Sequence, residues 1–257
     1  MIGDVVGEPG LKALEDKLPA IIKDNAVDFT VVNGENSADG FGMTEAALNR
    51  IIASGADVVT SGTHVWEKRE FWPVLETGER ILRPANYPAG CAGKGWLCVE
   101  KAGQNWFVIN LQGRELMTPI DCPFRCFDNV IKDIDNLSPL IIVDFHAESS
   151  REKEAMGYYI DGRAALVAGT HTHVQTADER ILPKGTAYIT DLGMTGVSDS
   201  VIGMDTQICM DRTCKQVLYR MEPAVDRQVN GKSSARVQGV IAEINAETGK
   251  ALSIKRI

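Results

Sequence analysis

The sequence predicts an α/β domain built around a mostly parallel sheet. Three short apolar runs typical of buried strands occur within about the first sixty residues, and helix-like patterns separate them. This β-α-β-α-β order favours parallel strands joined by right-handed crossovers. More strand-like runs follow at residues 106–111, 140–146, 164–168 and 188–190. We therefore expect a single domain over residues 1–257, with two sheets covered by helices.

The first elements follow from the spacing of apolar residues. The first strand ends at Asp4 and is short, so either the chain start has been trimmed or this strand is a stub. Residues 11–22 place leucine and isoleucine at helical intervals, with Pro19 as an expected kink. Residues 29–32 then form the next strand.

The following segment adds a helix, a strand and a loop. Thr44 can cap a helix whose apolar face includes Leu48 and Ile51, and residues 58–60 form the third strand. Residues 83–88, together with the glycine-rich stretch after them, are typical of a loop.

The second half of the chain is less regular. Residues 148–159 suit a charged surface helix that begins near Glu148, and residues 191–196 suit a turn. Residues 237–245 and 251–257 predict an antiparallel hairpin around a central turn.

Composition narrows the class of protein. Hydrophobic residues make up 44% of the chain, which is normal for a packed globular protein. No apolar run approaches the ~20 residues that span a bilayer, and the start lacks the pattern of a secretory signal, so we expect a cytoplasmic protein. A formal net charge of −8 argues against broad nucleic-acid binding. The six cysteines include no C-x-x-C pair, and we expect ordinary reduced thiols.

All four histidines follow strand-like runs directly. They are His64, His146, His171 and His173. Ligands of open α/β sheets bind outside the carboxyl ends of the strands, where these side chains would gather. The pattern predicts a metal cluster, whereas hydrogen-bonded polar residues at loop starts are the structural alternative.

Carboxylates occupy the same kind of position. Asp4 ends the first strand, and Glu35 follows the second within Asn-Gly-Glu-Asn. Glu35 could bridge two cations and Asn36 offers a neutral oxygen, although Asn-Gly is also a common turn. His64 could bind metal or act as a proton donor, and Asp144 could orient a histidine from behind. Nitrogen and oxygen ligands suit Fe, Mn, Zn, Co or Ni.

These motifs resemble the calcineurin-like binuclear metallophosphoesterases. They are more closely similar to the YmdB-like bacterial family of 2′,3′-cyclic nucleotide phosphodiesterases. The matching stretches are residues 2–7, 33–37, 83–88, 144–148, 169–173 and 190–196.

The resemblance implies a four-layer αββα sandwich and a site with two metal ions, with iron or manganese favoured. By position in the motifs, Asp4 and His173 would hold the first metal and Glu35 would bridge. The second metal would be held by Asn36, His146 and His171.

The activity implied is hydrolysis of cyclic nucleotides, with 2′,3′-cyclic esters favoured. A metal-bridging hydroxide would attack phosphorus, and His64 would protonate the leaving ribose oxygen as general acid. Asn86 or Tyr87 could shape the nucleotide pocket.

One departure from the family pattern is Thr63, which stands where the family has an asparagine ligand of the second metal. Its hydroxyl is shorter and could bind the metal weakly or hold a water instead. This motivates an alternative function, a nucleotide- or RNA-linked metal-binding regulatory protein with little catalysis. A third hypothesis is an amidohydrolase barrel with a His-x-His pair, but the predicted strands do not suggest the eight βα units of such a barrel. Homo-oligomerisation is left open.

Overall fold

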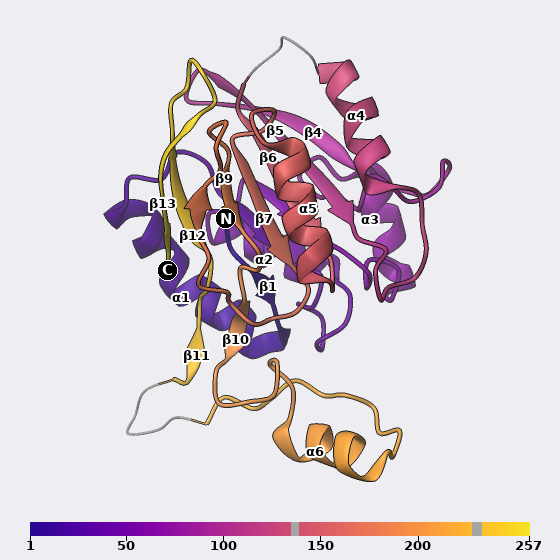
Figure 1. Ribbon diagram of the computed structural model, residues 1–257. Helices are drawn as coiled ribbons and strands as arrows, with labels where there is room; N and C mark the ends of the chain where they lie inside the picture. Colours follow the sequence, from indigo (N-terminus) through magenta and orange to yellow (C-terminus); the bar gives the residue numbers. More distant parts are fainter. Residues whose placement is uncertain (135–138, 228–232) are drawn as a thin grey trace.

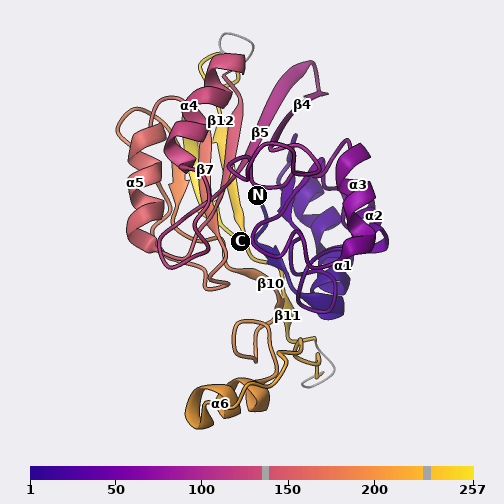
Figure 2. The same cartoon turned by 90° about the vertical axis from the view of Figure 1, so that its right-hand side faces the viewer.

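A computed structural model of the chain describes residues 1–134, 139–227 and 233–257. Seen edge-on in Figure 2, two layers of strands lie between two layers of helices. The predicted four-layer αββα sandwich is therefore confirmed.

One half of the sandwich contains the amino-terminal elements. Its strands are β1 (Asp4–Val5), β2 (Val31–Asn33), β3 (Val58–Thr60), β10 (Met194–Val197) and β11 (Ala235–Arg236). Strand β1 runs parallel to β10, and β2 runs parallel to β3. A parallel bridge between Ile2 and Val32 links the two pairs. The outer surface is covered by α1 (Gly7–Asp24) and α2 (Glu45–Ala53), followed by a 3₁₀ turn, η1 (Arg69–Phe71), and α3 (Trp72–Thr77).

The other half is a six-stranded sheet. Its strands are β4 (Trp96–Lys101), β5 (Gln104–Gln112), β6 (Ile141–His146), β7 (Leu166–Thr170), β8 (Arg180–Ile181) and β9 (Ala187–Ile189). Their order is β4-β5-β6-β7-β9-β8, with four parallel strands in the middle and an antiparallel strand at each edge. A sheet with two edges is not a closed βα barrel, so the amidohydrolase hypothesis is wrong. The outer face is covered by α4 (Pro123–Ile134) and α5 (Ser150–Ile160).

Alternation along the strands builds three apolar layers. Val31 and Val58 face the six-stranded sheet, where they pack with Ile142. Their neighbours Val32 and Val59 belong to the core beneath α1 and α2. Because adjacent strand residues point to opposite faces, one short strand serves two cores.

The local predictions were confirmed in most places. Thr44 caps α2 by accepting a hydrogen bond from the Ala47 N–H, and α1 continues through Pro19 to Asp24. The carboxyl-terminal hairpin consists of β12 (Val240–Ile244) and β13 (Ala251–Arg256), as expected.

One local prediction was wrong, and a second helix was confirmed with a shifted start. The stretch expected to be a turn ends in strand β10, which pairs with β1 far away in sequence. Helix α5 begins at Ser150, not near Glu148, because the Ser149 hydroxyl accepts a hydrogen bond from the Glu152 N–H. Glu148 is thereby left free to contact the site.

An excursion between β10 and β11 was not predicted. Its helix is α6 (Thr206–Lys215), which stands apart from the sandwich in both views (Figures 1 and 2). Among the helices of the described residues, none has the length and apolar character needed to cross a membrane.

Candidate metal centre

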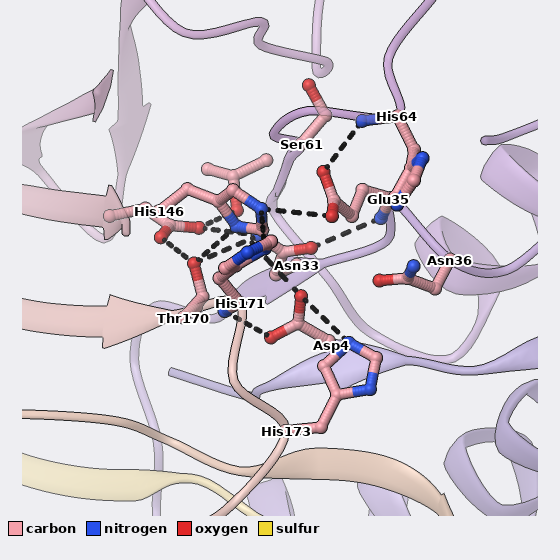
Figure 3. Close-up of polar contacts among 12 residues, drawn as sticks. Asp4, Asn33, Glu35, Asn36, Ser61, His64, His146, Thr170, His171 and His173 are labelled. Atoms are coloured by element: carbon pink, nitrogen blue, oxygen red, sulfur yellow. Dashed lines mark hydrogen bonds and ion pairs between the residues drawn. The ribbon is translucent and has the colours of Figure 1, made fainter. Parts of the chain in front are cut away.

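The residues singled out at strand ends converge in space. Their carboxylate, amide and imidazole groups come from β1, from the loop after β2, from the end of β6 and from the loop after β7 (Figure 3). They are Asp4, Glu35, Asn36, His146, His171 and His173. All but His171 are buried. Parallel strands from two sheets thus deliver the predicted cluster to one edge of the sandwich.

The inner part of the cluster contains three groups in direct contact. The Nε2 atom of His146 lies 3.0 Å from Glu35 Oε1. It also lies 3.0 Å from His171 Nδ1. One ligand atom from each of the three residues lies within 4.8 Å of the others, which is close enough to share an ion.

The second part is centred on Asp4. Its Oδ2 accepts a hydrogen bond from the His171 backbone N–H at 3.3 Å, and its Oδ1 lies 3.7 Å from His173 Nε2. The Asp4 carboxylate therefore lies between the two histidines of the His-x-His motif.

These two histidines lie in a tight turn of the backbone and not in an extended segment. His171 and His173 have φ angles of 99° and 64°, a region that costs non-glycine residues roughly 1–3 kcal/mol each. The buried Asp191 carboxylate stabilises the turn between them by accepting hydrogen bonds from the Thr172 N–H at 3.2 Å and hydroxyl at 2.8 Å. The Lys153 ammonium, 2.6 Å away, neutralises that carboxylate. Sequence reasoning missed both supporting residues, although Asp191 lies in a matched motif.

A hydrogen-bond relay fixes the tautomer of His146. The Thr170 hydroxyl donates its only proton to Asp144 Oδ1 at 2.7 Å. Thr170 must then accept from His146 Nδ1, 2.9 Å away, so this nitrogen bears the ring proton. The Nε2 lone pair is left directed at the cluster. The predicted orienting role of Asp144 is thus mediated by Thr170, a residue that the sequence reasoning did not single out.

The other two histidines are oriented in the same way. His173 Nδ1 donates to the Ile202 carbonyl at 2.8 Å, which leaves Nε2 facing Asp4. His171 Nε2 lies 3.2 Å from Glu148 Oε2, which leaves Nδ1 facing the inner cluster. Partners on the outer nitrogens are typical of histidines that bind metal through the inner ones.

Some oxygen atoms of the predicted ligands lack hydrogen-bond donors. Within the described residues, buried oxygens without a hydrogen-bond partner include Asp4 Oδ1, Asn36 Oδ1 and Thr63 Oγ1, and Glu35 Oε1 is paired with His146 Nε2. Buried acceptors without donors are costly, and cations bound at the cluster would satisfy them together. The donor set of carboxylate, amide and imidazole therefore fits divalent metal ions.

Gly62 lets the chain approach this cluster closely. A Cβ atom at this position would lie 2.3 Å from Glu35 Oε2 and 2.3 Å from His146 Nε2. Any side chain would therefore enter the space between these groups, which explains why the segment before Thr63 needs glycine.

The charges of the metal-free cluster are strongly perturbed. Burial raises the pKa of Asp4 to about 6. Burial would also raise the pKa of Glu35, but the charge of His146 outweighs it and lowers that pKa to about 2. Burial opposes a proton on His146 as well, but Glu35 raises the pKa of this imidazole to about 9. Burial, with the charge on His146, lowers the pKa of His171 to about 3. In the metal-free cluster the proton held between His146 and Glu35 therefore occupies the place where cations would bind.

His64 lies at the rim, outside the inner cluster. Its backbone N–H donates to Glu35 Oε2 at 3.3 Å, and its Nδ1 lies 3.3 Å from Glu67 Oε1. The ring meets Phe41 edge-on at 4.9 Å between centroids, and 26% of the side chain is exposed. The imidazole is thus anchored and remains accessible to a ligand.

The loop at residues 83–88 is less directly involved than expected. Asn86 is buried, and its amide bonds to the backbone of Gln112 and Asp121. Asn86 would therefore act on a nucleotide pocket only by holding the loop in place, and its role there stays a prediction. Tyr87 packs edge-on to Trp66 and donates its hydroxyl proton to Gln112 Oε1 at 3.2 Å.

Comparisons with known proteins point to one family. A model of the YmdB-like protein family matches residues 1–257. A relative from Bacillus subtilis (strain 168), described as a 2′,3′-cyclic-nucleotide 2′-phosphodiesterase, is 45% identical over 256 residues, covering 100% of this chain and 94% of the relative. The crystal structure of a phosphatase from Mycoplasma pneumoniae has a TM-score of 0.91 at 31% identity, covering 100% of this chain and 90% of that chain. A 5′-nucleotidase precursor from Thermus thermophilus, 14% identical with a TM-score of 0.52, covers 98% of this chain and 48% of that chain and shares the fold alone.

Proposed function

The chain belongs to the YmdB-like protein family, and on that premise we propose that it is a metal-dependent phosphodiesterase that hydrolyses 2′,3′-cyclic nucleotides. The observation that carries the proposal is the buried cluster of carboxylate and amide oxygens, some of them without a hydrogen-bond donor, which lies beside oriented imidazole nitrogens. The relative from B. subtilis supports the substrate class.

The ligand assignment follows the two parts of the cluster. Asp4 and His173 would hold one metal ion, and Glu35 would lie between the two sites. The second ion would be held by Asn36, His146 and His171, with Thr63 beside them. When bound, two such ions would supply Lewis acidity that neutralises phosphate oxygens and activates water at neutral pH, with iron or manganese as the favoured metals.

A protein side chain, His64, would supply the proton that the leaving ribose oxygen needs. Glu67 and Phe41 hold the ring of His64 at the rim of the cluster, where it would donate a proton to the leaving group. In the hydrolysis, water oxygen joins phosphorus, one P–O bond to the ribose breaks, and His64 gives its proton to the released ribose oxygen. General acids of this kind contribute about 10²–10⁴ in rate.

The test is hydrolysis of adenosine 2′,3′-cyclic phosphate by fresh protein loaded with Mn²⁺ or Fe²⁺. We expect turnover by the wild type, and a loss of about 10²–10⁴ in kcat for His64→Asn with an unchanged metal count. His146→Asn, the matched control, should lose metal as well. Absence of turnover by metal-loaded wild type would overturn the proposal.

A second substrate isolates the role of His64. A diester with p-nitrophenolate as leaving group needs little protonation, so His64→Asn should retain much more of its activity on that substrate. Equal losses on both substrates would contradict the general-acid role. The single-domain organisation and the cytoplasmic location stay predictions.

A further inference from the structure

A cavity of about 450 Å³ lies beside the proposed active site. It is lined by Phe41, Glu67, Lys68, Arg212, Arg220 and Met221. Two of these residues contact His64 directly: the Phe41 ring lies edge-on to it, and Glu67 lies within hydrogen-bond distance. The cavity thus opens next to the imidazole that we assign as proton donor.

The α6 excursion forms the opposite wall and is attached to the site. Arg212 lies on α6, and Arg220 and Met221 follow it. The Ile202 carbonyl in the same excursion accepts the hydrogen bond that orients His173. Met221 and Phe41 pack against one small apolar cluster. The residues on both sides of α6 are therefore held close to the metal centre, although α6 itself extends away from the sandwich.

The charge of the cavity differs from that of the whole protein. Three cations and one carboxylate line it, although the chain has a net charge of −8. Glu67 is engaged with His64, and Lys68 Nζ lies 3.4 Å from the largely exposed Asp39. Arg212 donates to the neutral Tyr219 carbonyl and forms no ion pair with a carboxylate of the described residues. Among the residues that the structure describes, Arg220 has neither an ion pair nor a hydrogen bond.

The proposed chemistry places the nucleoside on this side. The leaving oxygen belongs to the ribose of the substrate, and His64 protonates it, so the ribose must lie against His64. In this arrangement the cyclic phosphate would bind at the metal site and not in the cavity. A simple nucleoside 2′,3′-cyclic phosphate therefore leaves these cations without a partner.

We propose that the cavity binds a second phosphate, carried on the 5′ oxygen of the same ribose. The preferred substrate is then a ribonucleoside 2′,3′-cyclic phosphate with a 5′-phosphoryl group. This inference rests on the proposed function of the metal centre. Arginine guanidinium groups suit phosphate because they donate paired, charge-assisted hydrogen bonds. Phe41 and Met221 supply an apolar surface beside the ribose.

The experiment compares kcat/KM for adenosine 2′,3′-cyclic phosphate with and without a 5′-phosphate. We expect the 5′-phosphorylated substrate to be preferred about tenfold at low salt, which equals ~1.4 kcal/mol, and the preference to shrink as salt rises. Arg220→Gln should reduce the ratio at least about threefold. Arg125→Gln, an equal change of charge at an exposed site on α4, should leave the ratio intact.

A third substrate distinguishes the two sources of the 5′-phosphoryl group. The dinucleotide ApA ending in a 2′,3′-cyclic phosphate carries its 5′-phosphate as an internal diester. Preference for it indicates the end of an RNA fragment, and preference for the mononucleotide indicates a free nucleotide. A wild-type ratio near one, or an unchanged ratio in Arg220→Gln, would overturn the proposal while hydrolysis itself still stood.

Binding separates this proposal from the proposed function if no substrate is turned over. Calorimetry with Mn²⁺-loaded protein should show tighter binding of adenosine 3′,5′-bisphosphate than of adenosine 3′-phosphate, and Arg220→Gln should remove the difference. Equal affinities in the wild type would overturn the second-phosphate site.

Discussion

Replacing Thr170 with valine removes one hydroxyl from the relay between Asp144 and His146 and leaves the side-chain volume nearly unchanged. The hydroxyl accepts from His146 Nδ1 at 2.9 Å and donates to Asp144 Oδ1 at 2.7 Å. All three residues are buried, so neither partner can turn to water. The variant should therefore lose metal affinity through a residue that is not itself a ligand.

The magnitude follows from the two lost contacts. Each buried group left without its partner costs roughly 1–3 kcal/mol, so the metal-free protein should lose roughly 2–6 kcal/mol of stability. Loss of an outer hydrogen bond to a metal-binding histidine costs about 10–100-fold in metal affinity. Thr170→Ser keeps the hydroxyl and should retain most of both quantities.

The assay is titration of Mn²⁺ against a competing chelator, alongside urea unfolding of the metal-free proteins. Thr186→Val is the matched control. Its buried hydroxyl accepts from the Gly162 N–H at 2.8 Å and donates to the Ala164 carbonyl at 2.7 Å. Thr186 lies directly before the amino end of β9, away from the carboxyl ends where the metal centre lies. It should lose stability but not metal affinity. Wild-type affinity in Thr170→Val would refute the assignment of the His146 tautomer.

Further outcomes follow from the same geometry. Thr63→Asn restores the family residue and should raise the second-metal occupancy and turnover; tight nucleotide binding without turnover in both forms would instead favour the regulatory alternative. Gly62→Ala places a Cβ 2.3 Å from Glu35 Oε2 and should weaken Mn²⁺ binding about tenfold or more, measured by the same titration. Burial would raise the pKa of Asp178, but hydrogen bonds from neighbouring threonines hold it below its usual value. Its stability contribution is therefore present above the unfolded pKa and is lost as pH falls through the folded one, so Asp178→Asn should flatten acid unfolding curves as pH falls below the unfolded value of about 4.

The site residues could be predicted from the sequence wherever a polar residue directly follows a strand-like run. Parallel strands gather their carboxyl ends at one edge, so His146 and the His-x-His pair could be placed without coordinates. The cap at Thr44 and the terminal hairpin are equally local features, and both were confirmed.

Features that depend on distant partners were missed. Strand β10 exists because it pairs with β1, and no pattern within its four residues indicates this. The positive φ angles of the histidine loop depend on Asp191 and Lys153, which come from separate elements. Helix α4 is different, because Phe127, Val130 and Ile134 already have helical spacing and could have revealed it.

The most direct test of the metal centre is anomalous diffraction from crystals of Mn²⁺-loaded protein. Two peaks about 3.5–4 Å apart are predicted, one near Asp4 and His173 and the other near His146 and His171, with Glu35 touching both. Manganese bound elsewhere, or no peak at this edge of the sandwich under saturating metal, would contradict the account.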